Sequence, residues 1–387
     1  FRIFVPKGKD PVELWTLGII NDTGTRKNLS IFIYNQFQFR FKWGFDSYGD
    51  MIFRSSWFSK QFNAVVAEKH PHLRPHDYLT GFLTADEPIV AYDGTRDAFV
   101  GMYNTLREPE ADIRGQCTNT PGSADATIGA AQFNLQLDGG ESKEISLILG
   151  VVNEEKNIGF FRNKYFGNYE KYFCEIIEER KNRTTKNMVK TPDEHFNRMF
   201  NYWGKHQALF GATWCRWGWN GYRDIVQHGM GVSSFKPQRT KEILVEAFKH
   251  QYNSGLALRG WNPIDKKAYS DSSLWLVFTL ISYIKETGDT GFLEEIIPYY
   301  DGGNATVLSH IDQALDFLEN HKGSHGLCLI KFGDWNDSLT AVGKRGKGES
   351  VWLSEAYAEA LYQMANLAEY LNNDSKKRDY LERCKRI

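Results

Sequence analysis

The sequence has few cysteines and no excess of charge of either sign. Five cysteines occur among 387 residues, and no pair has the Cys-x-x-Cys spacing of a zinc or redox site. A sparse and odd set of thiols is typical of a reduced, cytoplasmic protein and argues against a disulfide framework. We therefore expect a cytoplasmic protein with no metal site.

Charge and hydropathy argue against two further classes of partner. Lys and Arg number 47 against 48 Asp and Glu, so the chain lacks the basic excess that is typical of nucleic-acid binding. No apolar run approaches the length of a membrane-spanning helix, and no basic amphipathic stretch suggests a membrane surface. Residues 1–20 also lack the layout of a signal peptide. These absences favour a small polar substrate such as a carbohydrate.

Both ends of the chain look cut. The sequence opens at Phe1 in strand-like sequence, without a methionine, and stops at Ile387 in a charged helical stretch. We therefore expect a piece of a longer protein.

The first part of the chain has the pattern of an antiparallel sheet. Apolar and polar residues alternate in short runs separated by turn residues, at 12–20, 29–37, 131–137 and 145–152. This alternation of β-branched and aromatic residues predicts a β-sandwich, which we place at residues 1–156.

From about residue 157 the apolar residues recur at helical spacing. Thr191-Pro192-Asp193-Glu194 has the cap residue, the first-turn proline and the early acids of a helix start. Helical periodicity continues through 196–209, 243–252, 274–285, 307–318 and 351–371. Helices of this length, joined by polar and aromatic loops, fit a helical toroid whose site lies at one end. We predict a helical linker over 157–190 and a truncated toroid over 191–387.

The densest cluster of candidate site residues lies at 331–338. Asp334 and Asp337 flank Trp335 and Asn336 there. An aromatic ring can stack on a pyranose face, an amide can bond hydroxyls, and a carboxylic acid can protonate a glycosidic oxygen. The alternative is a turn that caps the following helix.

Several motifs together resemble family 94 of the glycoside hydrolases, the inverting β-glucoside phosphorylases. They are Asp-Trp-Asn-Asp at 334–337, Gly-Lys-Gly-Glu-Ser-Val-Trp-Leu at 346–353 and Tyr-Arg-Asp at 222–224, with two β-sandwich landmarks at 12–15 and 96–101. The resemblance implies a β-sandwich, a helical linker and an (α/α)6 barrel. It also implies an enzyme that takes inorganic phosphate as co-substrate and needs no cofactor. Members of the family often form homodimers, so a homodimer is a further expectation.

The resemblance assigns roles to four residues near these motifs. Asp337 matches the general acid, and Trp335 matches the residue that lines the subsite of the transferred glucosyl unit. Asp224 matches the aspartate that grips sugar hydroxyls there, and its neighbour Arg223 is implied as a further substrate-binding residue.

Two further cations match less closely. Arg216 is the best match to an arginine that bridges sugar and phosphate, with a spacing that differs by a residue or two. Lys205 falls where several members have another arginine, and a point-like ammonium would alter that contact.

The expected reaction converts a β-glucoside and phosphate into α-glucose 1-phosphate and a shortened acceptor, with inversion. Phosphate is already an anion, so a phosphorylase can omit the second carboxylate with which an inverting hydrolase activates water. We expect an apolar wall such as Trp335, or a carboxylate such as Asp334 or Asp224, to raise the pKa of Asp337 so that it can donate a proton. An inverting β-glucoside hydrolase and a non-catalytic carbohydrate-binding module are the alternatives.

Other residues allow a structural and a functional interpretation. We favour a structural role for Asp334, which would tie the turn together, and a place behind the site for His228. Ser270-Asp271 either caps the following helix or belongs to an acceptor-side wall, and Glu349 either bonds a sugar or holds a helix start. Three cations either favour an anionic acceptor or face solvent: Arg259, Lys266 and Lys267.

In the family that the chain resembles, the barrel continues past the segment at 346–350. The later part supplies a histidine and a hydroxyl residue for phosphate, together with acceptor-binding residues. We therefore expect an incomplete phosphate site and an open barrel in this chain alone.

Overall fold

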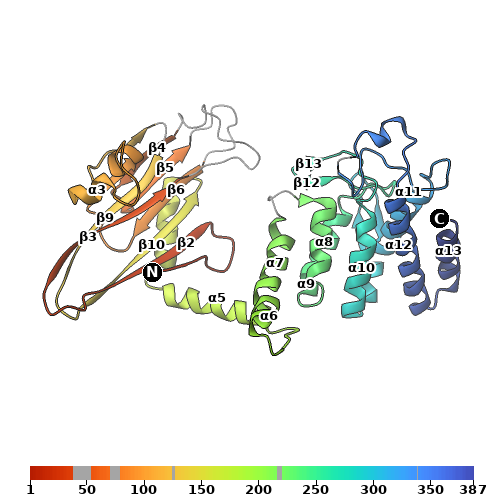
Figure 1. Cartoon of the computed structure of the whole chain (residues 1–387), viewed down its shortest axis with the longest axis horizontal. Helices are drawn as coiled ribbons and strands as arrows, with labels where there is room; N and C mark the ends of the chain where they lie inside the picture. Colours follow the sequence, from red (N-terminus) through yellow and green to blue (C-terminus); the bar gives the residue numbers. More distant parts are fainter. Residues whose placement is uncertain (38–53, 70–78, 124–126, 216–219, 338) are drawn as a thin grey trace. The chain divides into compact units, whose positions relative to one another are not determined.

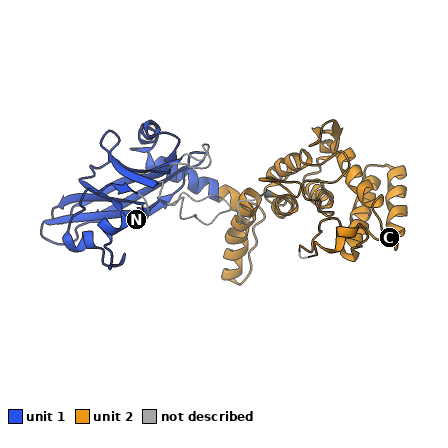
Figure 2. Cartoon of the chain, turned by 90° about the horizontal axis from the view of Figure 1, so that it is seen from above, with its two compact units in different colours: residues 1–180 blue, residues 181–387 orange. Residues whose placement is uncertain are grey.

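A computed structural model of the chain describes residues 1–37, 54–69, 79–123, 127–215, 220–337 and 339–387. They form two compact units, unit 1 at Phe1–Arg180 and unit 2 at Lys181–Ile387, which Figure 2 shows in blue and orange. The two units differ in secondary structure, as the change of periodicity predicts. Unit 1 contains the long strands and unit 2 is mainly helical (Figure 1).

Unit 1 contains two antiparallel sheets. The strand order is β1-β2-β10-β6-β5-β4-β8 in the larger sheet and β3-β9-β7 in the smaller one. The larger sheet is formed by β1 (Arg2–Phe4), β2 (Val12–Ile20), β4 (Arg54–Ser59), β5 (Ala64–Lys69), β6 (Leu79–Ala85), β8 (Gly122–Ser123) and β10 (Ser142–Val152). The smaller sheet is formed by β3 (Lys27–Gln36), β7 (Ala91–Thr95) and β9 (Thr127–Leu137), and two short helices follow β7, α2 (Arg96–Phe99) and α3 (Glu110–Arg114).

The larger sheet is buried on both faces. In β5, Val65 and Ala67 pack with residues of the smaller sheet such as Phe133. Ala64 and Val66 point to the other face, where they join a second apolar cluster. The two sheets therefore enclose one core, as a sandwich does, and the outer face of the larger sheet needs another cover.

Helices α4 (Ile158–Tyr165) and α5 (Tyr169–Thr184) provide that cover. Buried residues of both helices, including Phe161 and Tyr169, pack in the same cluster as Val66 and Phe82. The Tyr169 hydroxyl donates to the carbonyl of Leu147 on β10 at 2.7 Å. The part of the predicted helical linker (157–190) that runs from Ile158 to Ile176 thus packs in the cluster on this sheet, and the two units divide after residue 180.

Unit 2 is built of helices joined by long loops. They are α6 (Glu194–Arg198), a π-helical turn (Met199–Gly204), α7 (Lys205–Trp214), α8 (Tyr222–Val232), α9 (Pro237–Phe248), α10 (Leu274–Thr287), α11 (Val307–Glu319), α12 (Val351–Tyr370) and α13 (Asp374–Lys385). Short strands lie in the loops: β11 (Asn220–Gly221), β12 (Gly260–Asn262), β13 (Ile264–Asp265), β14 (Ile296–Pro298) and β15 (Asn304–Thr306). Within the residues that the structure describes, none of these helices has both the length and the apolar character needed to cross a membrane.

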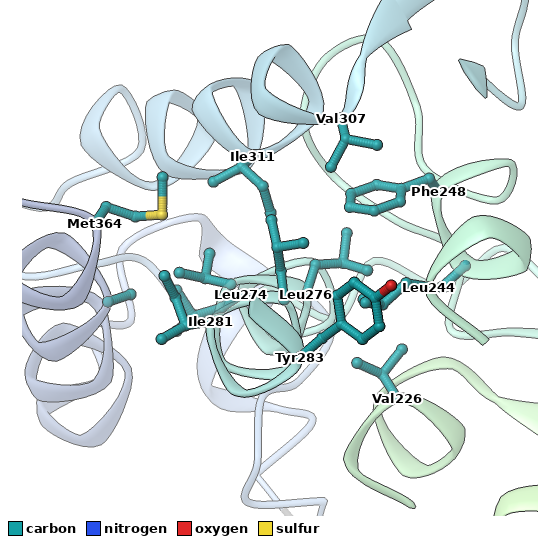
Figure 3. Packing of buried hydrophobic residues seen from close by; sticks show 14 of the residues in the cluster. Val226, Leu244, Phe248, Leu274, Leu276, Ile281, Tyr283, Val307, Ile311 and Met364 are labelled. Atoms are coloured by element: carbon teal, nitrogen blue, oxygen red, sulfur yellow. The ribbon is translucent and has the colours of Figure 1, made fainter. Parts of the chain in front are cut away.

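Alternate helices of unit 2 contact one another. Helix α10 packs against both α8 and α12, while α9 packs against α8 and α10, and α11 against α10 and α12. Figure 3 shows apolar side chains of these helices gathered in one cluster, among them Ile281 of α10, Ile311 of α11 and Met364 of α12. This arrangement confirms a helical domain after the sandwich.

The core of unit 2 allows a matched test of packing. Ile311 is fully buried among these helices, whereas Ile296 on β14 is 72% exposed. We expect Ile311→Ala to lower the free energy of unfolding by about 2–5 kcal/mol, because it leaves a cavity, and Ile296→Ala to change it by less than about 0.5 kcal/mol. Denaturant unfolding of the whole protein measures both, and equal losses would contradict the described core.

Candidate active site

A cavity of about 540 Å³ in unit 2 collects most of the predicted site residues. Helix α8 contributes Arg223, Asp224, Gln227 and His228, and the loop before α12 contributes Trp335 and Asp337. The remaining lining residues are Cys215, Arg259, Tyr269 and Ser272. Four of the predicted substrate and catalytic residues therefore share one cavity: Arg223, Asp224, Trp335 and Asp337.

The first turn of α8 is fixed from behind. Tyr222 is fully buried, and its hydroxyl donates to the carbonyl of Ala247 on α9 at 2.9 Å. Its backbone N–H donates to the carbonyl of Arg259 at 2.8 Å. Helical spacing then places Asp224, Gln227 and His228 on one face, which is the face that lines the cavity.

The loop that bears Trp335 and Asp337 is held by Asp334. The buried Asp334 carboxylate accepts the backbone N–H of Asn336 at 2.8 Å and the hydroxyl of Ser350 at 2.5 Å. Ser350 is the N-cap of α12, and its side chain accepts the N–H of Leu353 at 3.1 Å. These contacts support the structural role that we favoured for Asp334, because one carboxylate joins the loop to a helix start.

Arg223 joins α8 to the same loop. Its Nη1 donates to the backbone carbonyl of Asp334 at 2.6 Å, and its Nη2 donates to Oδ1 of Asp337 at 2.5 Å. The guanidinium also lies over the ring of Trp335, 5.2 Å from its centroid. Burial lowers the pKa of Arg223, but the carboxylates of Asp271 and Asp337 raise it more, so the pKa is raised overall.

Trp335 belongs to a group of three indoles. Its ring stacks on Trp352 of α12 with centroids 5.8 Å apart, and it lies 5.3 Å from Trp275 of α10. The Trp335 side chain is still 42% exposed. An indole that keeps part of its surface exposed beside a cavity is suited to contact with a sugar ring.

Asp337 differs from our expectation in its surroundings. The side chain is 64% exposed and pairs with the Arg223 guanidinium. We expected an apolar wall or a second carboxylate beside it, and the structure places a cation there instead.

One predicted cation, Lys205, does not line the cavity. Lys205 is buried, and its ammonium donates to the backbone carbonyls of Thr184, at 2.9 Å, and Lys186. Burial lowers the pKa of Lys205. Its placement gives no support to a substrate contact, because the ammonium is engaged by the backbone. Arg216 lies outside the described residues.

Of the other candidate residues, some line the cavity and some lie elsewhere. His228 lines the cavity and also packs on α7, where a Cβ at Gly211 would lie 2.6 Å from its ring. Glu349 instead holds the turn at 323–327, since its Oε1 accepts the N–H of His325 at 3.2 Å. Arg259 lines the cavity and pairs with Asp265 at 3.1 Å, whereas two cations lie over rings of other residues, Lys266 over Tyr300 and Lys267 over Phe332.

The sequence interpretation missed the part that Asp271 takes in the site. Its side chain does not cap α10, whose N-cap is Ser273. It is fully buried and accepts Nε1–H of Trp275 at 3.1 Å and Nη1–H of Arg223 at 3.4 Å. Burial raises the pKa of Asp271 to about 6, against the opposing effects of Arg223 and Trp275. The spacing of Asp271 and Trp275, one helical turn apart, was the available signal.

Metal chemistry has no candidate ligands in the described ranges. No group of three or more His, Cys, Asp or Glu side chains in them is arranged to hold an ion.

Comparison with known proteins identifies the family. Residues 1–166 match the model of the glycosyl hydrolase 94 supersandwich domain, and residues 180–387 match that of the glycosyl hydrolase 94 superfamily catalytic domain. The chain therefore belongs to the glycosyl hydrolase 94 family, as its motifs predict.

Several relatives carry names of phosphorylases. The solabiose phosphorylase of Paenibacillus borealis is 33% identical over 100% of this chain and 50% of its own length. The N,N'-diacetylchitobiose phosphorylase of Vibrio furnissii is 31% identical over 95% of this chain and 50% of its own length. The cellobionic acid phosphorylase of Neurospora crassa is 26% identical over 92% and 46%, respectively. The chain thus spans about half the length of these curated relatives.

Because Ser350 also bonds Asp334, removing this helix cap should lower the free energy of unfolding more than removing another cap does. Thr306 caps α11 through the N–H of Ser309 at 3.2 Å, so Thr306→Ala should cost about 1 kcal/mol of unfolding free energy. Ser350→Ala should cost about 1–3 kcal/mol more, because it also leaves the buried Asp334 carboxylate short of a donor. Denaturant unfolding of the two variants tests this, and equal costs would show that the Asp334 contact contributes nothing.

Proposed function

We propose that the whole protein catalyses inverting phosphorolysis of a β-glucoside. Inorganic phosphate attacks the anomeric carbon, the bond to the leaving sugar breaks, and the products are α-glucose 1-phosphate and a shortened acceptor. The observation that carries the proposal is the common cavity of Asp224, Trp335 and Asp337, in a chain of the glycosyl hydrolase 94 family. Relatives named as phosphorylases of three different substrates support the reaction class.

Each side chain has a chemical task in this proposal. Asp337 protonates the glycosidic oxygen as the acceptor leaves. The exposed part of the Trp335 indole packs on the glucosyl ring, and Asp224 accepts hydrogen bonds from the hydroxyls of that ring. Arg223 lies between the stacking residue and the acid, where it can orient both and offer donors to an anion.

Three finer points belong to the same proposal. The alternate packing of α8, α10 and α12 supports an (α/α)6 barrel in the whole protein. Arg216 would bridge sugar and phosphate, and its position in sequence between α7 and α8 supports a place near the cavity. A homodimer is carried over from the family alone.

One observation favours a second candidate, an inverting β-glucoside hydrolase. Asp224 and Asp337 line the same cavity, and an inverting hydrolase uses one carboxyl as acid and another to activate water. The dependence of turnover on phosphate separates the two reactions, because only the hydrolase releases the sugar units without phosphate.

The proposal predicts phosphate-dependent turnover that fails without Asp337. Incubated with β-linked glucodisaccharides, the whole protein should form α-glucose 1-phosphate only when phosphate is present. Asp337→Asn should lower kcat by about 10²–10⁴-fold, because the proton donor is lost. Product analysis by NMR identifies the sugar phosphate and its anomer.

Asp379→Asn on α13 is the matched control. The Asp379 side chain is 60% exposed, similar to Asp337, and does not line the cavity, so this variant should retain kcat within about twofold. Free sugars without phosphate would favour the hydrolase, and an active Asp337→Asn variant would remove this residue as the acid. A parent protein that binds sugar without turnover would favour a binding module.

A further inference from the structure

Asp271 is a fully buried carboxylate beside the cavity, and no role in the reaction described so far uses it. The residue is fully buried and lies just before α10 in the sequence. Its Oδ2 accepts from Arg223 and Trp275, while its Oδ1 is buried with no hydrogen-bond partner among the described residues. A carboxylate retained in such a place costs free energy, which favours a functional role for it.

One guanidinium is shared by two carboxylates. Arg223 reaches Asp271 with Nη1 at 3.4 Å and Asp337 with Nη2 at 2.5 Å. The third acceptor, the carbonyl of Asp334, holds the guanidinium between them. With both carboxylates ionised this group carries one positive and two negative charges, so the carboxylates compete for one cation.

We propose that Asp271 is a positioning residue that draws the charge of Arg223 away from Asp337 and so allows Asp337 to carry the proton that it donates. The inference rests on the proposed phosphorolysis, in which Asp337 is the acid. The reaction itself is unchanged: Asp337 gives its proton to the glycosidic oxygen, and Asp271 neither gains nor loses one.

The competition favours Asp271 when it is ionised. A guanidinium held against a carboxylate favours the ionised carboxylate, which is unfavourable for a proton donor. Asp271 interacts with Arg223 in a buried, low-dielectric place, whereas Asp337 is 64% exposed and screened by water. Burial raises the pKa of Asp271 to about 6, so it is mostly ionised at and above neutral pH, where an acid catalyst most needs to keep its proton.

Other titratable groups face this set and must be held constant in a test. Asp334 and Asp224 add negative charge near Asp271 and Arg223, and the Arg223 guanidinium lies over the Tyr269 ring. Two further groups line the same cavity, Arg259 and His228. A variant that changes only Asp271 leaves all of them in place.

The pH profile of kcat/KM for phosphorolysis tests the proposal. In Asp271→Asn the Arg223 charge is left to Asp337, so the acid loses its proton at lower pH. We expect the alkaline limb of the profile to move to lower pH by about one unit. Titration of phosphate itself is common to parent and variant and cancels in the comparison. A purely structural role would instead lower the rate equally at every pH.

Two further variants make the test specific. Asp93→Asn alters another fully buried aspartate, in unit 1, and should leave the limb in place whatever its effect on stability. Trp275→Phe removes the indole donor that helps to keep Asp271 ionised, and should move the limb in the same direction by a smaller amount. It also serves as the test if Asp271→Asn does not fold.

The outcomes are distinct. A limb that stays in place or moves to higher pH in the folded variants overturns the inference and leaves the proposed phosphorolysis standing. A parent protein that forms no α-glucose 1-phosphate from any β-glucoside overturns the proposed function, and the inference falls with it.

Discussion

A single, partly buried arginine connects the parts of the candidate active site. Arg223 stands in the first turn of α8, and its guanidinium bonds the backbone of Asp334, the carboxylate of Asp337 and the carboxylate of Asp271. A buried cation needs such partners, because an unpaired charge in a low-dielectric place is costly. The loop that bears Trp335 and Asp337 therefore cannot move far without breaking contacts that α8 also needs.

The rest of unit 2 serves to keep this arrangement rigid. Helix α10 packs against both α8 and α12, and residues of all three helices belong to one core. Asp334 and Ser350 tie the loop to the start of α12, and Tyr222 ties the start of α8 to α9. A site that must hold a sugar and an acid in a fixed relation gains from this support, because positioning contributes a large part of catalysis.

The local sequence pattern was sufficient to predict most of the helices and strands, but it could not predict contacts between residues that are far apart in the sequence. The alternation at 12–20 coincides with β2, and the helical spacing at 351–371 matches α12 within a residue. Asp224 and Asp337 could be placed in one site only through the family's motifs, since more than a hundred residues separate them and no spacing rule spans that distance. The cover that α4 and α5 give the sheet, the carbonyl contacts of Lys205 and the bond of Asp271 to Arg223 depend on tertiary packing. In each of these cases the local sequence was equally compatible with another role: a helical linker at 157–190, a substrate contact for Lys205 and a helix cap for Asp271.

A crystal structure tests most directly whether Asp337 protonates the glycosidic oxygen of the bond that breaks. The whole protein with Asp337→Asn should bind an unbroken β-glucoside disaccharide. We expect the glucosyl ring against the exposed part of the Trp335 indole, and the amide of the substituted side chain about 3 Å from the glycosidic oxygen. A disaccharide seated elsewhere, or a glycosidic oxygen beyond hydrogen-bond reach of position 337, would contradict it.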